Sequence, residues 1–551
     1  MDITLRDQIL LGCRRLLTQL NRDPSTATYG CLDRRFWAWK MVDFPEATFQ
    51  RNLNPICWYI DQPEAKTYRE ILSKNIKAGL FYSFSLQHND GSFDQAYPHE
   101  HSYGATAFLL PDLISVYKKV KGAFSEIERT RVEVGLRKSA DFLCNGAEKH
   151  EYIANHLAGA ALALKKAHSI FNEKKYDQKA NDILNSILDQ QSDEGWFPEY
   201  GGADPGYQTL CMYYLAQIFE IDHPMDLKTA IEKSLQFLQF FIHPDGTFGG
   251  EYGSRRTEIY YPGGIALLSP EFPIAASMHA NMLNSITSGK TVNLIDVDMG
   301  NLAPLLSNYI SANSIGEAQN NNPILPLEEQ NLTHIFKNAG LVAISKPAYY
   351  AILGTSNGSI LKIFDKNSKN IIFNDCGFLG ETDDGRKISN QITDINNQLT
   401  WEGKVFRSHS SFGFISAQIP SPFNYLILRI ANLTVMRVML INEMIKKFLV
   451  KLLINKKSRI SLSLSREVNF KENSILVTDK LEKYGSVRIS SLVSGIKFSS
   501  IHMASSRYFT PAQFKALDHA EIDTKRLQKN GFVERKLTID LNRSTKVKKN
   551  A

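Results

Sequence analysis

Hydrophobic residues follow two different periods along this chain. Up to Leu283 they recur at helical spacing in long segments that glycine-bearing loops separate. Helices are predicted at residues 3–20, 68–86, 102–119, 126–144, 153–171, 176–190, 208–219 and 227–241. Beyond residue 330, short segments rich in β-branched residues alternate hydrophobic with polar positions between polar turns. This second pattern predicts an antiparallel sheet.

A loop pattern recurs along the helical part at intervals of about 50 residues. Its turn glycines are Gly91, Gly195 and Gly246, and a weaker turn falls at Gly146. A period of this length with helical flanks is typical of an array of helical hairpins. The chain of 551 residues is also too long for one hydrophobic core.

Together these patterns predict an α+β multidomain protein. We expect an (α/α) toroid of helical hairpins over residues 1–312 and an antiparallel β-sandwich over residues 331–551. Residues 313–330, which are rich in Asn and Pro, are expected to form the linker between the two domains.

If the hairpins close into a ring, equivalent loop positions converge on one end of it, the mouth of the toroid. A count of about nine to fourteen residues past each turn glycine reaches His101, then Asn155 and His156, then Tyr207, and then Tyr260. Further polar residues of the same loops, together with one arginine of an aromatic-rich loop near the N-terminus, complete the predicted substrate-binding set: His99, Glu100, His101, Tyr103, Arg255, Arg256, Tyr260 and Arg34.

The residue types at this mouth suit removal of a proton from a carbon next to a carboxylate. That chemistry needs a group that neutralises the carboxylate, a base for the carbon proton and an acid for the leaving oxygen. Asn155 suits the first role, and either His156 or His101 suits the second. Tyr207 suits the second or the third role. The alternative to a catalytic role is structural: Asn155 would cap the helix that begins here, and the ring of His156 would pack in the core.

The motif around Asn155 also resembles a known family. Ile153-Ala154-Asn155-His156-Leu157 opens a helix rich in Ala and Leu, and Tyr207 follows in the next hairpin. With a toroid before a β-sandwich, this is similar to the heparinase II/III family of polysaccharide lyases. The resemblance implies that Asn155, His156 and Tyr207 act on a uronic acid by C5 proton abstraction and β-elimination. It also implies a histidine from the β domain, for which His409 is the first candidate and His334 the second.

Other functions use the same ring. A glycoside hydrolase would need two carboxylates, and the mouth loops offer Asp94, Glu100, Glu199, Asp204, Glu251 and Glu258. A uronyl C5-epimerase would use the residues of a lyase, and a non-catalytic glycan-binding protein would use the Tyr, Trp and Arg of the loops. Squalene cyclases and protein prenyltransferases share the ring, but their acidic and zinc-binding motifs have no match in this sequence.

The net charge and the cysteines indicate which partners and cofactors to expect. The net charge is +7, which suits an anionic partner; we expect an anionic polysaccharide or oligosaccharide and no nucleic acid. The six cysteines show no metal spacing, so we expect reduced thiols, no metal and no cofactor.

The N-terminal segment is interrupted by charges and lacks the apolar core of a secretory signal. A cytoplasmic location and a role in cell-surface polysaccharide metabolism are therefore expected. Residues 425–454 are apolar but interrupted by charges, which predicts a strand and a basic amphipathic helix with peripheral membrane contact.

Overall fold

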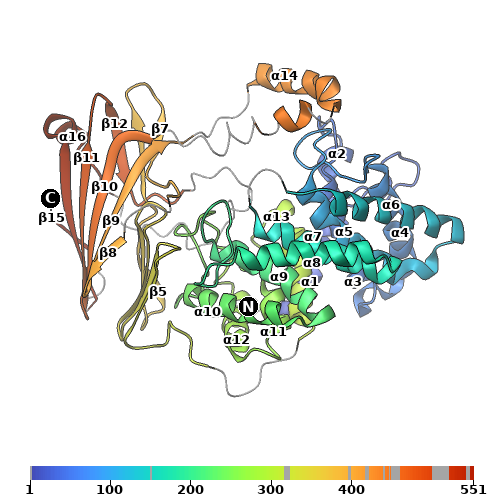
Figure 1. Cartoon of the computed structure of the whole chain (residues 1–551), viewed down its shortest axis with the longest axis horizontal. Helices are drawn as coiled ribbons and strands as arrows, with labels where there is room; N and C mark the ends of the chain where they lie inside the picture. Colours follow the sequence, from blue (N-terminus) through green and yellow to red (C-terminus); the bar gives the residue numbers. More distant parts are fainter. Residues whose placement is uncertain are drawn as a thin grey trace.

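The protein consists of a helical part and a two-sheet part that lie side by side (Figure 1). The computed structural model describes residues 3–148, 152–315, 323–394, 399–415, 421–438, 441–445, 447, 459–498, 520–541 and 547–550. The last helix of the first part ends at Asn313 and the first strand begins at Leu332. Part of the predicted linker, residues 316–322, lies outside the described residues.

An inner ring of helices forms the centre of the helical part. Each helix packs against the next, and α13 returns to α3, so that the ring closes. Its members are α3 (Leu53–Tyr59), α5 (Tyr103–Val120), α7 (Ala154–Phe171), α9 (Pro205–Asp222), α11 (Pro262–Leu268) and α13 (Met299–Asn313). Small residues allow this close packing: a Cβ added at Gly264 of α11 would lie 2.5 Å from the backbone nitrogen of Tyr213 on α9.

Amphipathic helices form an outer layer around this ring. Helix α8 is typical, because it buries Ile183, Leu184 and Ile187 while its polar positions face outward. The outer helices are α1 (Leu5–Leu17), α4 (Arg69–Ser85), α6 (Glu126–Asn145), α8 (Lys174–Asp189), α10 (Met225–Leu238) and α12 (Pro273–Thr287). Shorter elements join them: α2 (Arg34–Trp37), η1 (Ala47–Asn52), η2 (Pro63–Tyr68), η3 (Lys121–Ala123) and η4 (Gln239–Phe241). The predicted toroid of helical hairpins is confirmed.

Two antiparallel sheets make up the second part. The first has five strands in chain order: β1 (Leu332–Phe336), β2 (Leu341–Ser345), β3 (Tyr349–Gly354), β4 (Ile360–Asp365) and β5 (Asn370–Asn374). The second follows the order β13 (Ala520–Glu521), β12 (Ile489–Ser494), β6 (Phe378–Thr382), β7 (Lys387–Ser389), β9 (Val405–Phe414), β10 (Arg459–Phe470), β11 (Ser474–Lys483), β14 (Phe532–Asp540) and β15 (Val547–Asn550). Strand β8 (Leu399–Glu402) pairs with β9, and α16 (Thr524–Asn530) packs on this sheet.

The first sheet lies between the toroid and the second sheet. One of its faces, with Val342 and Ile344, packs on the second sheet, where it meets Val468. The opposite face, with Tyr350 and Ile352, belongs to the core of the helical part. Strands β2 and β3 are therefore buried at every position. The predicted β-sandwich is confirmed, and its inner sheet is also the surface that docks on the toroid.

Buried charges join the two parts as well. Lys362 of β4 places its Nζ 2.6 Å from Oε2 of Glu251 and 2.9 Å from Oε1 of Glu258, and both acids belong to the loop between η4 and α11. Lys497 pairs with the same two acids at 3.2 and 2.7 Å. We call Glu251, Glu258, Lys362 and Lys497 the interface ion cluster.

The segment that begins near Tyr425 is a helix, and the predicted strand there is wrong. Helix α14 spans Pro422–Leu433, with Pro422 in its first turn and the Ser421 side chain as its N-cap, and η5 spans Val435–Arg437. These two start signals are sufficient to favour a helix. The segment returns to the toroid, where Arg429 pairs with Asp43 (Figure 1).

Helix α14 carries a row of exposed apolar side chains: Phe423, Tyr425, Leu426, Ile427, Ile430 and Leu433. Within the described part of the chain, the helices are too short or too polar to cross a membrane. Peripheral membrane contact through this segment stays a prediction, and residues 451–454 of the predicted basic helix lie outside the described residues.

Candidate active site

Asn155 stands at the start of α7 and is held by an acid from the next hairpin. Its side-chain Nδ2 donates to Oε1 of Glu199 at 2.6 Å, and its backbone nitrogen donates to the same oxygen at 3.2 Å. Asn155 and Glu199 are both buried, and a β-bridge between Ile153 and Glu199 joins their loops. The Asn155 amide therefore has a fixed position.

Arg255 brings a third hairpin loop to the same place. Its guanidinium donates from Nη1 to Oε2 of Glu199 at 3.3 Å, and its Cζ lies 3.3 Å from the centre of the Tyr207 ring. The Tyr200 ring lies on it as well, at 4.9 Å. Burial lowers the pKa of Arg255, but Tyr207 and Glu199 raise it, and the net shift is upward. Arg255 therefore keeps its charge in a buried place.

Asp204 fixes the two loops that carry Tyr207 and Arg255. As the N-cap of α9, it accepts from the backbone nitrogen of Tyr207 through Oδ1 at 2.9 Å. Its other oxygen accepts from the backbone nitrogen of Arg255 at 2.8 Å. Burial raises the pKa of this carboxyl to about 6, although both backbone donors act in the opposite direction. Asp204 is a structural tie between neighbouring hairpins.

His156 follows Asn155 on α7 and faces the start of α5. Its Nδ1 lies 2.9 Å from Oε2 of Glu148, and its ring packs edge to face on Phe108 with centroids 5.0 Å apart. The start of α5 touches it, because a Cβ added at Gly104 would lie 2.7 Å from His156 Nδ1. A carboxylate on one imidazole nitrogen sets the ring's orientation. We call Asn155, His156, Glu199, Tyr207 and Arg255 the site cluster.

Tyr260, predicted at the mouth, is instead a core residue. Its side chain is fully buried against Phe248, and its hydroxyl has no hydrogen-bond partner among the described residues. The next residue, Tyr261, is buried as well. The predicted place of Tyr260 at the mouth is therefore wrong.

Arg256 also points away from the site cluster. Its Nη2 donates to Oδ1 of Asn357 at 2.9 Å and to the backbone oxygen of Gln391 at 2.5 Å, both in the second part of the chain. Its φ of 59° turns the backbone so that Arg255 and Arg256 diverge. Arg256 fastens the two parts together, and its predicted contact with substrate is not supported.

Other predicted binding residues have structural partners of their own. Glu100 accepts from the backbone nitrogens of Gln95 and Ala96 at 2.8 and 2.7 Å and so closes its own loop. The Tyr103 ring is buried beside Phe142. Contact of Glu100 and Tyr103 with substrate stays a prediction.

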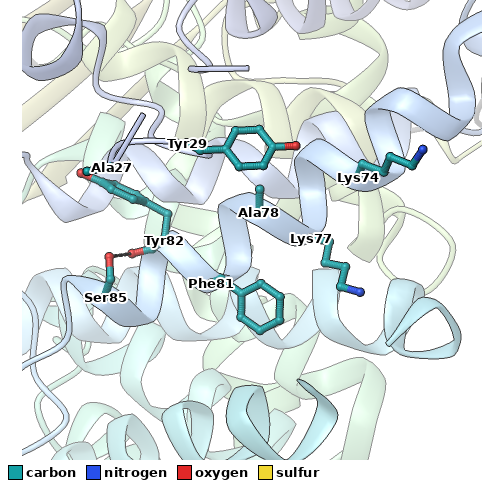
Figure 2. Close-up of a pocket in the computed structure, with 8 residues that line it drawn as sticks. All are labelled: Ala27, Tyr29, Lys74, Lys77, Ala78, Phe81, Tyr82 and Ser85. Carbon is teal, nitrogen blue, oxygen red and sulfur yellow. Dashed lines mark hydrogen bonds between the residues drawn. The ribbon is translucent and has the colours of Figure 1, made fainter. Parts of the chain in front are cut away.

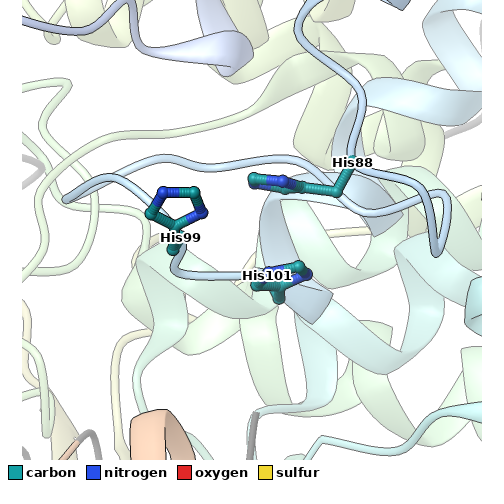
Figure 3. Close-up of side chains that lie close together, drawn as sticks. All are labelled: His88, His99 and His101. Carbon is teal, nitrogen blue, oxygen red and sulfur yellow. The ribbon is translucent and has the colours of Figure 1, made fainter. Parts of the chain in front are cut away.

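Arg34 and the two predicted histidines lie in other surroundings. Arg34 packs over Trp37, with its Cζ 4.9 Å from the ring centre, and donates to the backbone oxygen of Thr18. His99 and His101 join His88 in a group of three imidazoles (Figure 3). The structure does not bring these three predicted residues into the site cluster.

His409 is not placed to act as the histidine of the β domain. Along β9, Phe406 faces the core between the sheets, whereas His409 is exposed on the opposite face and bonds Ser465 of the neighbouring strand at 3.2 Å. His334, the second candidate, packs its ring on Phe240 at 4.6 Å. The prediction for His409 is wrong because strand alternation turns it outward.

Sequence reasoning did not assign Glu199 or Asp204 to these contacts, and it missed Glu148 and Tyr200. Glu199 and Asp204 were noted only as acids of the mouth loops. The signal for Asp204 was its position, because an Asp before Pro at the start of a helix is typical of an N-cap. Tyr200 has a φ of 53°, an unusual backbone conformation that the sequence pattern does not predict.

Two pockets on the outer wall are not part of this site. One of about 480 Å³ lies along α4 and is lined by Ala27, Tyr29, Lys74, Lys77, Ala78, Phe81, Tyr82 and Ser85 (Figure 2). Its lysines are paired, Lys74 with Glu70 and Lys77 with Glu128. The other, of about 550 Å³, lies between α8 and α10 around Lys165. The site cluster lines neither pocket.

Known proteins resemble both the toroid and the whole fold. Residues 61–266, which include the entire site cluster, match the family described as Ulvan lyase N-terminal domain. No curated protein matches the chain.

Two solved structures share the arrangement of a toroid before a sandwich. The chondroitin AC lyase of Streptomyces coelicolor A3 in complex with chondroitin sulphate has a TM-score of 0.53 at 10% identity, over 88% of this chain and 67% of that one. Heparinase III has a TM-score of 0.53 at 12% identity, over 90% of this chain and 73% of that one. The predicted resemblance to polysaccharide lyases of this fold is confirmed.

Proposed function

We propose that this protein is a polysaccharide lyase that cleaves a uronic-acid-containing, anionic polysaccharide by β-elimination, in the metabolism of a cell-surface polysaccharide. One observation carries the proposal: three consecutive hairpin loops bring Asn155, Glu199, Arg255 and Tyr207 into one buried chain of contacts. Asn155 contacts Glu199, Glu199 contacts Arg255, and Arg255 contacts Tyr207. The family match covers all four residues. A fold shared with a chondroitin AC lyase and heparinase III supports the same reaction class.

The first requirement of the reaction is to neutralise the uronate carboxylate, because this makes the C5 proton acidic. Asn155 donates one N–H of its amide to Glu199, and the amide group has a second N–H. We assign this second N–H to the substrate carboxylate. Glu199 is then a positioning residue, since it fixes the amide before substrate arrives.

Tyr207 is the proton carrier in this proposal. The buried guanidinium of Arg255 lies on its ring, and a nearby positive charge favours the ionised form of a phenol. As base, the phenolate takes the C5 proton while the bond from C4 to the glycosidic oxygen breaks and a C4–C5 double bond forms. The same hydroxyl then returns the proton to the departing oxygen, so that atoms and charge balance.

His156 marks the side from which the sugar enters. His156 is partly exposed, whereas Asn155 and Tyr207 are buried. The carboxylate of Glu148 fixes the ring, which makes His156 a second candidate for the base. A sugar bound from this side meets His156 first and reaches Asn155 on the same turn of α7.

The contacts of the loop acids argue against a glycoside hydrolase. That reaction needs two carboxylates on opposite sides of one glycosidic bond. Glu251 and Glu258 are paired with Lys362 and Lys497 in the interface ion cluster. Both carboxylate oxygens of Asp204 accept hydrogen bonds from backbone nitrogens. These acids hold the fold together and do not form an open pair.

The test is incubation with a panel of uronic-acid polysaccharides, including chondroitin sulphate, heparan sulphate and ulvan. A lyase releases products whose new double bond absorbs in the ultraviolet. Reducing ends without that absorbance would instead identify a hydrolase, and deuterium uptake at C5 without chain cleavage would identify an epimerase. Binding without any of these changes would reduce the protein to a glycan-binding module.

A further inference from the structure

We propose that His88, His99 and His101 bind one divalent transition-metal ion of the zinc type. One ring nitrogen from each of the three lies within 4.8 Å of the other two. The rings gather on the loop between α4 and α5 (Figure 3), where His88 stacks on His101 with centroids 4.1 Å apart and lies 5.7 Å from His99. The inference does not rest on the proposed lyase activity.

The loop is folded so that residues distant in sequence meet at this point. A bridge between Phe93 and Ser102 closes it. Asp94 organises its far side, where Oδ2 accepts from the backbone nitrogen of His99 at 2.7 Å and Oδ1 accepts from that of His101 at 3.0 Å. Backbone hydrogen bonds therefore bring the three histidines to one place.

His101 already has the kind of carboxylate partner that metal-binding histidines have, and a second carboxylate lies close to His88. Nδ1 of His101 lies 2.8 Å from Oδ2 of Asp90, and Nε2 of His88 lies 2.8 Å from Oδ1 of Asp94. In metal sites a ligating histidine usually gives its other ring N–H to a carboxylate. For His101 the nitrogen assigned to the metal is therefore Nε2. His88 Nε2 makes no hydrogen bond among the described residues, so either nitrogen of this ring is open to the ion. His99 supplies the third ligand.

Charge and ligand type select the class of metal. Three neutral imidazoles contribute no charge, and the carboxylates of Asp90 and Asp94 balance a doubly charged ion, although Arg437 adds a positive charge near His99. Imidazole suits Zn²⁺, Cu²⁺, Ni²⁺ and Co²⁺, whereas Ca²⁺ and Mg²⁺ prefer oxygen ligands. Zinc–nitrogen bonds are about 2.0–2.1 Å long, so rotation of the three rings must bring the nitrogens closer together.

The metal would stabilise a strained loop next to the site cluster. His99 and His101 have φ values of 63° and 50°, which are costly for residues with a side chain. The loop leads directly into α5, whose Gly104 lies against His156. Three histidines leave a fourth position for water or for an oxygen of a ligand.

The experiment uses the full chain after treatment with a chelator and removal of the chelator. Titration with Zn²⁺ followed by calorimetry is expected to show one equivalent bound, and Co²⁺ is expected to give the visible absorption of a four-coordinate site. Zinc should also raise Tm. Excess Ca²⁺ or Mg²⁺ should not compete.

Matched variants locate the site. His99→Asn places at this position a residue that tolerates positive φ. This variant should no longer bind the one equivalent of Zn²⁺. Asp90→Asn should weaken binding by about 10- to 100-fold through the lost carboxylate partner. His409→Asn, which removes an exposed histidine outside the group, should bind zinc like the wild type. Absence of a zinc equivalent in the folded wild-type protein, or its survival in folded His99→Asn, would overturn the proposal.

Discussion

The guanidinium carbon of Arg255 lies 3.3 Å from the centre of the Tyr207 ring, and Asp204 bonds the backbone nitrogen of both residues. Tyr207 lies in the first turn of α9 and Arg255 belongs to the following hairpin, so the contact exists only when the two hairpins are in register. A buried cation on an aromatic face is worth about 2 kcal/mol or more once desolvated. The packing of the two hairpins therefore places Arg255 on the ring of Tyr207, where the proposed chemistry needs a positive charge.

Replacing Tyr207 with Phe should leave folding and substrate affinity nearly unchanged, because the ring still packs under Arg255. Turnover should fall by about 10²- to 10⁴-fold, the usual value of a general acid or base. The measurement is the initial rate of unsaturated-product formation at saturating substrate. Tyr260→Phe is the matched control, since that hydroxyl is buried without a described partner, and its turnover should equal the wild type. Full activity in Tyr207→Phe would refute the assigned role.

Arg255 and Arg256 offer a second comparison between neighbouring residues. Arg255→Met removes the positive charge from Tyr207, so turnover should fall and its pH profile should move to higher pH, because the phenolate is no longer favoured. Arg256→Met should lower Tm, since it removes the bonds to Asn357 and Gln391. Its pH profile should not move. An equal shift in both variants would show that Arg255 acts only through the fold.

The amide of Asn155 is predicted to act on the substrate carboxylate. Asn155→Ala should reduce turnover by about 10²- to 10³-fold, the usual loss when one donor to a developing anion is removed. Asn181→Ala, which changes an exposed asparagine on α8, serves as the control and should retain full activity. Kinetics over a range of substrate concentrations separate the loss of turnover from a change in KM. An Asn155→Ala enzyme with wild-type turnover would remove this residue from the mechanism.

The repeat spacing was enough to predict the toroid, because equivalent positions in stacked hairpins share one end of the ring. It also selected Asn155 and Tyr207, which the structure links through Glu199 and Arg255. It failed at Tyr260, because spacing alone does not fix which side chains of a loop pack into the core. His409 failed for another reason: the face of a strand depends on its pairing, here β9 with β10. Phe406 on the inner face then requires His409 to lie on the outer one.

The three-histidine group was not predictable from ligand spacing. His88 lies 11 residues before His99, and no standard motif has this arrangement. The group forms because Asp94 bonds the backbone at His99 and His101 and meets the ring of His88. These bonds depend on the folded loop.

The helix at α14 was predictable, by contrast, because Ser421 and Pro422 are start signals that the hydrophobic run obscured.

The interface ion cluster predicts how acid affects the union of the two parts. Burial alone would raise the pKa of Glu258, but Lys362 and Lys497 hold it well below the ordinary value of 4.5. A depressed pKa gives stability that is present above about pH 4.5 and is lost as the pH falls below it, because the unfolded chain then binds more protons. Tm should therefore drop as the pH is lowered from about 5 to 3.

Lys362→Met tests whether this cluster is the cause. The change leaves Glu251 and Glu258 buried with Lys497 alone, and breaking a buried ion pair costs about 3–5 kcal/mol. Calorimetry at pH 7 should show a markedly lower Tm, and the difference from the wild type should shrink as acid protonates the two glutamates. Lys74→Met is the matched control, since Lys74 pairs with Glu70 on the exposed surface and its loss should leave Tm unchanged. A wild-type Tm in Lys362→Met would mean that the apolar contacts of the first sheet alone hold the two parts together.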